Sequence, residues 1–173
     1  MIPTKKMDLF LLTGASGVGK STAAEILFQR ESDYLVMESD LLWDERFNTP
    51  ENLYAPYREL WLTVCANISQ IGKPVVLCGC GVPEQFEPRE ARRYFNKLYY
   101  LALVCDPKEL ERRMRQGRNI TDDSWIQSSL DYNQWLLENG EQAGICLINT
   151  TEKTPEQAAE QIDQWIQNHM VFL

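Results

Sequence analysis

The segment that most constrains the fold is residues 14–21, which read G-A-S-G-V-G-K-S and match the pattern G-x-x-x-x-G-K-[ST] in full. The apolar run at residues 9–13 predicts a buried strand before it, and the apolar spacing of residues 22–28 predicts a helix after it. A glycine-rich turn between a strand and a helix gathers backbone N–H groups and the positive end of the helix dipole around one point. We therefore predict that this turn binds a polyphosphate.

The residue types within this turn suit a nucleoside triphosphate and its metal ion. The glycines permit a tight turn, Lys20 is expected to reach the β and γ phosphates of ATP, and the Ser21 hydroxyl is expected to bind Mg²⁺. ATP and Mg²⁺ are thus the predicted cofactors. The residues predicted to contact the nucleotide here are Gly14, Ala15, Ser16, Gly17, Val18, Gly19, Lys20, Ser21 and Thr22.

Two acids follow the second predicted strand. The apolar run at residues 34–37 ends in Glu38-Ser39-Asp40, and the C-terminal ends of parallel strands line the ligand crevice of an open sheet. We therefore predict Glu38 and Asp40 beside the phosphate-binding turn, as contacts of a phosphoryl acceptor. Asp40 has three open roles: it accepts a proton from the acceptor hydroxyl, binds Mg²⁺, or caps a helix that begins at Leu41.

The third predicted strand, residues 74–78, is an unbroken apolar run that leads into Gly79-Cys80-Gly81. Gly79 and Gly81 allow the backbone to approach a ligand closely and are candidate acceptor contacts, with a simple tight turn as the alternative. Arg58, on a helix predicted over residues 57–71, is a candidate for binding an anionic acceptor. The strand carries no acid where motor ATPases place their metal-binding carboxylates, which argues against that class.

Four arginines lie within seven positions, at 112, 113, 115 and 118, in a chain of negative net charge. They follow Asp106-Pro107, which has the pattern of a helix start, as do Thr154 and Gln157 further along the chain. We expect a helical lid over about residues 115–140 that brings Arg115 and Arg118 to the transferred phosphoryl group and excludes water. The predicted catalytic residues are Lys20, Asp40, Arg115 and Arg118, and Arg112 is predicted to contact the nucleotide.

The length and charge of the chain disfavour several classes of protein. A length of 173 residues suits one domain spanning 1–173. The net charge of −8 disfavours a nucleic-acid partner, and no apolar run approaches the roughly 20 residues of a membrane span. Five cysteines, an odd number without a C-x-x-C pair, indicate reduced thiols in a cytoplasmic protein. We therefore expect a small-molecule partner and a monomer or homodimer.

Taken together, these segments resemble the P-loop small-molecule kinase family, which includes adenylate kinase, shikimate kinase, gluconate kinase and chloramphenicol phosphotransferase. Residues 14–21 match its phosphate loop, residues 38–42 look like its acceptor-side acids, and residues 78–81 are similar to its glycine-rich turn. The resemblance implies an α/β fold of three layers, with a five-stranded parallel sheet in the order 2-3-1-4-5. It also implies that Asn149 lies in the turn beside the adenine.

The expected activity is transfer of the γ-phosphate of ATP to a hydroxyl of a nucleoside, a sugar acid or an antibiotic-like molecule. The segments Gly-Cys-Gly and Glu-Ser-Asp differ from the Gly-Gly-Gly and Asp-x-Asp of shikimate kinases, which argues against shikimate as the acceptor. Two alternatives stay open. One is a nucleotide-monophosphate kinase that holds the acceptor phosphate with Arg46, Arg58 and Arg89. The other is a non-catalytic, ATP-binding regulatory protein.

Overall fold

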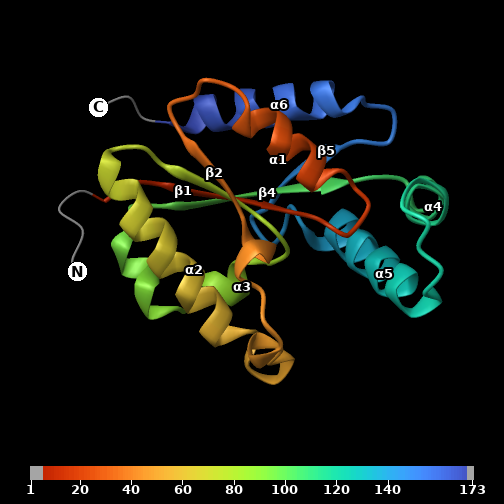
Figure 1. Ribbon diagram of the computed structural model, residues 1–173, viewed down its shortest axis with the longest axis horizontal. Coiled ribbons are helices and arrows are strands. Elements are labelled where there is room, and N and C mark those ends of the chain that lie inside the picture. Colours follow the sequence, from red (N-terminus) through yellow and green to blue (C-terminus); the bar gives the residue numbers. More distant parts are fainter. Residues whose placement is uncertain (1–5, 171–173) are drawn as a thin grey trace.

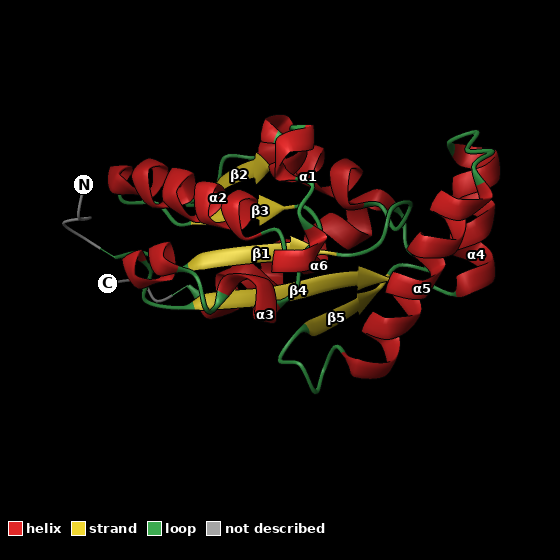
Figure 2. Cartoon of the chain, turned by 90° about the horizontal axis from the view of Figure 1, so that it is seen from below, coloured by secondary structure: helices red, strands yellow, loops and turns green. Residues whose placement is uncertain are grey.

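The computed structural model describes residues 6–170, and a five-stranded parallel sheet forms its centre (Figure 1). The strand order is β2-β3-β1-β4-β5, so the order predicted from the family resemblance is confirmed. All five arrows in Figure 2 point toward the same end of the sheet, where α4 and α5 lie. The strands are β1 (Leu9–Thr13), β2 (Leu35–Glu38), β3 (Val75–Cys78), β4 (Leu98–Val104) and β5 (Cys146–Asn149).

Helices cover both faces of the sheet and give the expected three layers. One face is covered by α1 and α6, which contact each other, and the other by α2, α3 and α5 (Figure 1). The α-helices are α1 (Lys20–Phe28), α2 (Ala55–Ile68), α3 (Pro83–Phe86), α4 (Pro107–Arg112), α5 (Asp123–Asn139) and α6 (Pro155–His169). None of the helices within residues 6–170 combines the length and the apolar character needed to cross a membrane.

The sheet separates two hydrophobic clusters, because successive side chains of a strand point to opposite faces. Phe10 of β1 packs with Tyr99 of β4 and Trp165 of α6, at ring-centroid distances of 5.1 and 5.6 Å. Its neighbour Leu11 belongs to the opposite cluster, with Trp61 of α2. Every residue of β1 is buried, so the strand that leads into the phosphate-binding turn is held firmly from both sides.

Two predicted helix starts are confirmed. The Asp106 carboxylate accepts hydrogen bonds from the backbone N–H groups of Lys108 and Glu109 and thus caps α4. Thr154 and Gln157 form a reciprocal capping box at the start of α6. Both starts lie at the end of the sheet where the phosphate-binding turn opens, so they fix the helix ends that border it.

Two predicted element boundaries are wrong. No helix begins at Leu41, because a 3₁₀ turn, Ser39–Leu42, already contains Asp40 as its second residue. The helix predicted over 57–71 begins two residues earlier, at Ala55, and its α-helical part ends at Ile68. Pro56 lies in the first turn of this helix, where a proline loses no hydrogen bond.

The predicted lid region, residues 115–140, is docked on the core at several points. The Asn133 side chain of α5 is fully buried, donates to the Cys105 carbonyl at 2.8 Å and accepts from the Cys105 N–H at 3.1 Å. This pair of bonds ties α5 to the end of β4. Ile120 is also buried in the hydrophobic core. Lid motion over residues 115–140 therefore stays a prediction.

Candidate active site

The phosphate-binding turn has the backbone conformation that its glycines were expected to permit. Gly14 and Gly17 have φ values of 141° and 88°, which side chains rarely allow. A Cβ atom on Gly14 would lie 2.5 Å from the Leu103 carbonyl oxygen, and one on Gly17 would lie 2.8 Å from the Met114 side chain. Neither position can therefore hold a larger residue without displacing β4 or the segment after α4.

Lys20 lies across this turn. Its ammonium group donates hydrogen bonds to the Gly14 and Ala15 carbonyl oxygens at 2.5 and 2.8 Å. The next residue, Ser21, donates from its hydroxyl to a Glu38 carboxylate oxygen at 3.4 Å. The first turn of α1 and the end of β2 are thus in contact, as the sequence predicted.

A pair of hydrogen bonds fixes the backbone between the two acids. The hydroxyl of Tyr57 and the indole N–H of Trp61, both on α2, donate to the Ser39 carbonyl oxygen. The Ser39 side chain packs so closely on Gly79 that a Cβ atom there would lie 2.0 Å from the Ser39 hydroxyl oxygen. Gly79 is therefore needed for the approach of two chain segments, whether or not a ligand also touches it.

The two acids differ in their surroundings. Partial burial raises the pKa of Glu38, and the nearby charge of Asp40 raises it further, while the Ser21 hydrogen bond and Lys20 oppose the shift. Asp40 lies inside a 3₁₀ turn whose N-cap is Glu38, so it does not hold the helix-capping position that was one of its three expected roles. Its carboxylate is exposed and free to contact a ligand.

A large cleft of about 990 Å³ opens over the phosphate-binding turn, and we call it the phosphate-loop cleft. Its walls come from residues 16–22, the end of β2, the segment around α4, the start of α5 and the turn that leads into α6. Its volume lies at the upper end of the range for small-molecule sites. The lining residues outside the loop include Glu38, Asp40, Gly79, Cys80, Arg112, Arg113, Arg118, Trp125, Thr150, Thr151 and Pro155.

Three of the four clustered arginines are held by carboxylates. Arg112 and Arg113 both donate to Glu109, which lowers the pKa of that acid to about 2. Arg113 also donates to the Thr150 carbonyl at 2.8 Å and so fastens the segment after α4 to the turn that follows β5. These bonds give Arg113 a structural role for which the sequence offered no signal.

The two arginines predicted to be catalytic are placed differently. Arg115 forms ion pairs of 2.8 Å with Glu111 and with Asp123, and it does not line the phosphate-loop cleft. Arg118 lines the cleft, stacks on the Trp125 ring at 5.5 Å, and has no ion-pair partner within residues 6–170. Arg118 is therefore the arginine of this cluster that is free to meet an anion.

Asn149, predicted to lie beside the adenine, folds back on its own turn. Its side-chain oxygen accepts hydrogen bonds from the Thr151 N–H at 2.9 Å and the Thr151 hydroxyl at 2.6 Å. It is not among the residues that line the phosphate-loop cleft, whereas the following residues from Thr150 to Pro155 are. The turn after β5 thus lines the cleft as predicted, but through Thr150 and Thr151 and not through Asn149.

A second hollow of about 410 Å³ adjoins the cleft, and we call it the aromatic pocket. Asp40 and Cys80 line both spaces, so the two meet at these residues. Gly81 and Arg58, two of the predicted acceptor contacts, line the pocket, whereas Glu38 lines only the cleft. The complete lining is Ser39, Asp40, Trp43, Asn48, Tyr54, Tyr57, Arg58, Cys80, Gly81, Val82, Gln85 and Tyr132.

Arg58 has an unusual environment in the aromatic pocket. Its side chain is only 6% exposed, its Nε atom is buried without a hydrogen-bond partner, and burial lowers its pKa. The rings of Tyr54, Tyr57 and Phe86 lie 5.6, 5.4 and 5.0 Å from the guanidinium carbon. No carboxylate within residues 6–170 forms an ion pair with Arg58. Its positive charge therefore has no neutralising partner in the pocket.

The pocket also contains two residues that sequence reasoning missed. Tyr132 of α5 shares a 2.8 Å hydrogen bond with the Thr13 hydroxyl, which in turn accepts from the Gly81 N–H at 3.0 Å. Gln85 of α3 has a buried side-chain oxygen without a partner. Both residues come from elements remote in sequence from the motifs, and no spacing pattern marked them.

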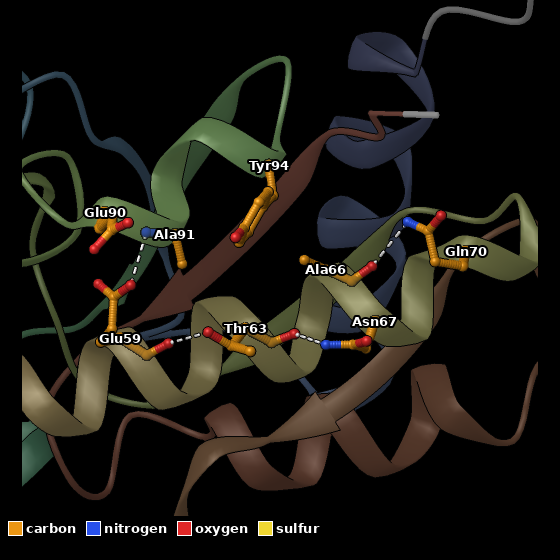
Figure 3. A pocket seen from close by; sticks show the side chains of 8 residues that line it. All are labelled: Glu59, Thr63, Ala66, Asn67, Gln70, Glu90, Ala91 and Tyr94. Atoms are coloured by element: carbon orange, nitrogen blue, oxygen red, sulfur yellow. Dashed lines mark hydrogen bonds between the residues drawn. The ribbon is translucent and has the colours of Figure 1, made fainter. Parts of the chain in front are cut away.

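A third hollow, of about 250 Å³, lies between α2 and the 3₁₀ turn Glu90–Tyr94 (Figure 3). Its polar groups are satisfied within the protein: Glu59 accepts from the Ala91 N–H at 2.8 Å, and Asn67 donates to the Thr63 carbonyl at 2.8 Å. It shares no lining residue with the phosphate-loop cleft or the aromatic pocket. We therefore place the candidate chemistry at the junction of those two.

Comparisons with known proteins identify the family and the fold of the chain. A family model described as "AAA domain" matches residues 11–141, and a search of curated proteins found no match. Among solved structures, a sugar kinase from Janibacter sp. HTCC2649 superposes with a TM-score of 0.65 at 18% identity, covering 94% of this chain and 95% of that one. A gluconokinase from Sinorhizobium meliloti 1021 gives 0.60 at 17% identity, with coverage of 95% and 100%. The tunicamycin resistance protein of Deinococcus radiodurans gives 0.62 at 17% identity, with coverage of 93% and 96%. At these identities the likeness establishes a shared fold.

Proposed function

We propose that this chain, a member of the AAA domain family, transfers the γ-phosphate of ATP to a hydroxyl of a small anionic molecule. Its fold is that of P-loop small-molecule kinases, which supports this activity. The observation that carries this proposal is the meeting of the phosphate-loop cleft and the aromatic pocket at Asp40 and Cys80. A phosphotransferase needs two such spaces that open onto one point, since donor and acceptor must touch there.

On the donor side, the triphosphate would lie along the N–H groups of the phosphate-binding turn. Lys20 would exchange its two carbonyl partners for phosphate oxygens, and Arg118 would reach the same group from the far wall of the cleft. Both cations would stabilise the charge that spreads over the transferred phosphoryl oxygens.

The oxygen groups beside the phosphate-binding turn suit a magnesium ion. The Ser21 hydroxyl and the Glu38 carboxylate are 3.4 Å apart, and Asp40 adds a second carboxylate on the same rim. Mg²⁺ prefers such oxygen ligands, together with water and phosphate. When bound, it would neutralise part of the charge of the phosphates. The metal site was predicted at Ser21 and Asp40, and the contact with Ser21 supports adding Glu38.

Asp40 is the proposed general base. Its exposed carboxylate would accept the proton of the acceptor hydroxyl, while the hydroxyl oxygen forms a bond to the γ-phosphorus and the bond from that phosphorus to the bridging oxygen of ADP breaks. Asp40 suits this role because it lines both spaces, whereas Glu38 lines only the donor side.

Arg58 supports an acceptor that carries one negative charge. Of the three arginines considered for an acceptor phosphate, Arg46 is exposed and lies 3.4 Å from Asp44, and Arg89 does not line the aromatic pocket. One guanidinium balances a carboxylate better than a doubly charged phosphate. This distribution favours a hydroxy acid over a nucleoside monophosphate as the acceptor.

A panel assay tests the proposal. ATP consumption is measured with Mg²⁺ and a series of hydroxy acids, nucleosides and nucleoside monophosphates, each added separately. The proposal predicts that one class of hydroxy acid accelerates turnover at least about a hundredfold over the rate without acceptor. Tight ATP binding without any acceptor-dependent turnover would instead support the non-catalytic regulatory alternative.

A further inference from the structure

The turn after β3, residues 79–81, is attached to β1 first by the backbone and then by a side chain. The Gly79 N–H donates to the Leu12 carbonyl at 3.0 Å, which continues the pairing of the two strands. Two residues later, the Gly81 N–H donates instead to the side-chain hydroxyl of Thr13, at 3.0 Å. The turn lines both the phosphate-loop cleft and the aromatic pocket, and we call it the acceptor turn.

Thr13 is in turn hydrogen-bonded to Tyr132 of α5. Their hydroxyl oxygens are 2.8 Å apart, and the Tyr132 hydroxyl donates to the Gly81 carbonyl at 3.4 Å. Because a hydroxyl carries one proton, Tyr132 then accepts from Thr13, while Thr13 accepts from the Gly81 N–H. The two side chains and the peptide groups of Gly81 thus form a closed cycle of three hydrogen bonds. We call it the hydroxyl cycle.

The hydroxyl cycle is shielded from water. Thr13 is 2% exposed, and burial raises the pKa of Tyr132 to about 12, so the tyrosine hydroxyl keeps its proton at neutral pH. In a buried cycle each hydrogen bond orients the next one, and removal of one member leaves the others with unpaired groups. The position of Gly81 therefore depends on both hydroxyls.

The hydroxyl cycle joins the two halves of the candidate active site. Thr13 is the last residue of β1 and precedes Gly14, the first residue of the phosphate-binding turn. Gly81 lines the aromatic pocket. Tyr132 precedes Asn133, whose side chain ties α5 to the end of β4. A firmly docked helix thus holds the donor and acceptor sides together.

We propose that Tyr132, acting through Thr13, is a positioning residue that holds the acceptor turn in a fixed place relative to the phosphate-binding turn. The acceptor hydroxyl has to approach the γ-phosphorus in line with the bond that breaks. A displaced acceptor turn therefore lowers the rate of transfer without weakening nucleotide binding. This catalytic consequence rests on the function proposed above, whereas the attachment of the turn is a property of the fold.

Conservative variants test the attachment without any acceptor. Tyr132→Phe and Thr13→Val each remove one hydroxyl and keep the shape of the side chain, whereas Thr13→Ser keeps the hydroxyl. Amide hydrogen–deuterium exchange of the full chain, resolved to single amides by mass spectrometry, follows the Gly81 N–H. We expect exchange about fivefold or more faster in Tyr132→Phe and in Thr13→Val, and within about twofold of the wild type in Thr13→Ser.

Two controls separate local loosening from a general loss of stability. Ser129→Ala also removes a buried hydroxyl from α5, but that hydroxyl donates to the Trp125 carbonyl within the helix and does not line the aromatic pocket. It should leave Gly81 exchange within about twofold of the wild type. The amide of Leu11, in the buried strand β1, serves as the internal reference and should exchange at the wild-type rate in every variant.

Kinetics test the catalytic consequence. Phosphoryl transfer is measured at varied ATP and varied concentrations of the acceptor that the panel assay identifies. Tyr132→Phe should lower kcat/KM for the acceptor by about tenfold. The KM for ATP and the Kd of a non-hydrolysable ATP analogue should change by less than about twofold, which a general weakening of the fold would not predict. Ser129→Ala should leave all three values unchanged.

Two results would overturn the inference: Gly81 exchange in Tyr132→Phe equal to that of the wild type, or faster exchange together with an unchanged kcat/KM for the acceptor. Failure of the proposed function gives a different pattern, because then no acceptor supports transfer in the wild-type protein. In that case the catalytic role of Tyr132 is wrong as well, and the exchange rates alone decide whether the hydroxyl cycle holds the acceptor turn.

Discussion

The indole N–H of Trp61 donates a 3.0 Å hydrogen bond to the carbonyl oxygen of Ser39, the residue between the two acids Glu38 and Asp40. Trp61 lies on α2 and is buried in the core, so this bond connects the acids to the hydrophobic core. The orientation of the proposed base is therefore set by a residue that contacts neither cleft nor pocket.

Replacing this donor should weaken both stability and activity. Trp61→Phe leaves the Ser39 carbonyl with Tyr57 as its remaining donor, and we expect a loss of about 1–3 kcal/mol in the free energy of unfolding, measured in urea. Acceptor-dependent kcat should fall by about tenfold because Asp40 is less well oriented. Trp135→Phe, at an exposed position of α5, is the control. Unchanged kcat in Trp61→Phe would show that the bond does not position the base.

The raised pKa of Glu38 predicts a pH-dependent stability. Burial and the charge of Asp40 disfavour its ionised form in the folded protein, so this residue destabilises the fold once pH rises above its unfolded pKa of about 4.3. Glu38→Gln should therefore raise the melting temperature near neutral pH, and the difference should disappear below about pH 4. Because Glu38 is partly solvated, the gain should stay below about 1 kcal/mol.

Thermal unfolding followed by circular dichroism across this pH range measures the effect. Glu25→Gln, which removes an exposed carboxylate from α1, controls for the change in net charge. A Glu38→Gln protein that is less stable than the wild type at neutral pH would mean that the Ser21 contact outweighs burial and repulsion.

Arg118 and Arg115 should differ in their effect on catalysis. Arg118 lines the phosphate-loop cleft without an ion-pair partner in the described part of the chain, so Arg118→Ala should lower kcat by about tenfold to a hundredfold. Arg115 is held by Glu111 and Asp123 outside the cleft, and Arg115→Ala should change kcat by less than about threefold. Steady-state kinetics with saturating ATP gives both values. The reverse order would mean that Arg115 leaves its ion pairs during turnover.

Asn133 should contribute strongly to stability, because its side chain holds α5 against the end of β4. Asn133→Leu leaves the N–H and the carbonyl of Cys105 without partners, and we expect a loss of about 2–4 kcal/mol in the free energy of unfolding. Gln134→Leu, at an exposed position one residue later, should cost less than about 0.5 kcal/mol. Similar effects of the two substitutions would indicate that the anchor to β4 contributes little.

Much of the donor half of the site was predictable from the sequence. The turn at residues 14–21 depends on local backbone geometry set by consecutive residues, so a sequence motif is sufficient to predict it. The helix caps at Asp106 and Thr154 are also local, and both are confirmed. The strand order came from the family resemblance, because spacing along the chain does not determine which strands pair.

The acceptor half was less predictable because it depends on contacts between distant segments. Arg58 was a candidate by residue type alone, and only the fold reveals that three rings surround it and that no carboxylate does. Gln85 and Tyr132 carry no motif, and their places in the pocket follow from where α3 and α5 meet the sheet. Arg115 and Asn149 lie in segments that border the cleft, but neither side chain lines it. Arg115 forms an ion pair with Glu111, and Asn149 accepts a hydrogen bond from the backbone of Thr151.

Transfer of phosphate to an acceptor is the central claim, and mass spectrometry of a defined mixture tests it most directly. The protein is incubated with Mg²⁺, ATP labelled with ¹⁸O in the γ-phosphate, and a pool of ring-bearing and polyhydroxylated acids. We predict that label appears in a phosphorylated acid, and that Asp40→Asn lowers this rate by about a hundredfold or more while ATP binding is retained. Label that appears only in inorganic phosphate, or a rate of transfer unchanged in Asp40→Asn, would contradict the account.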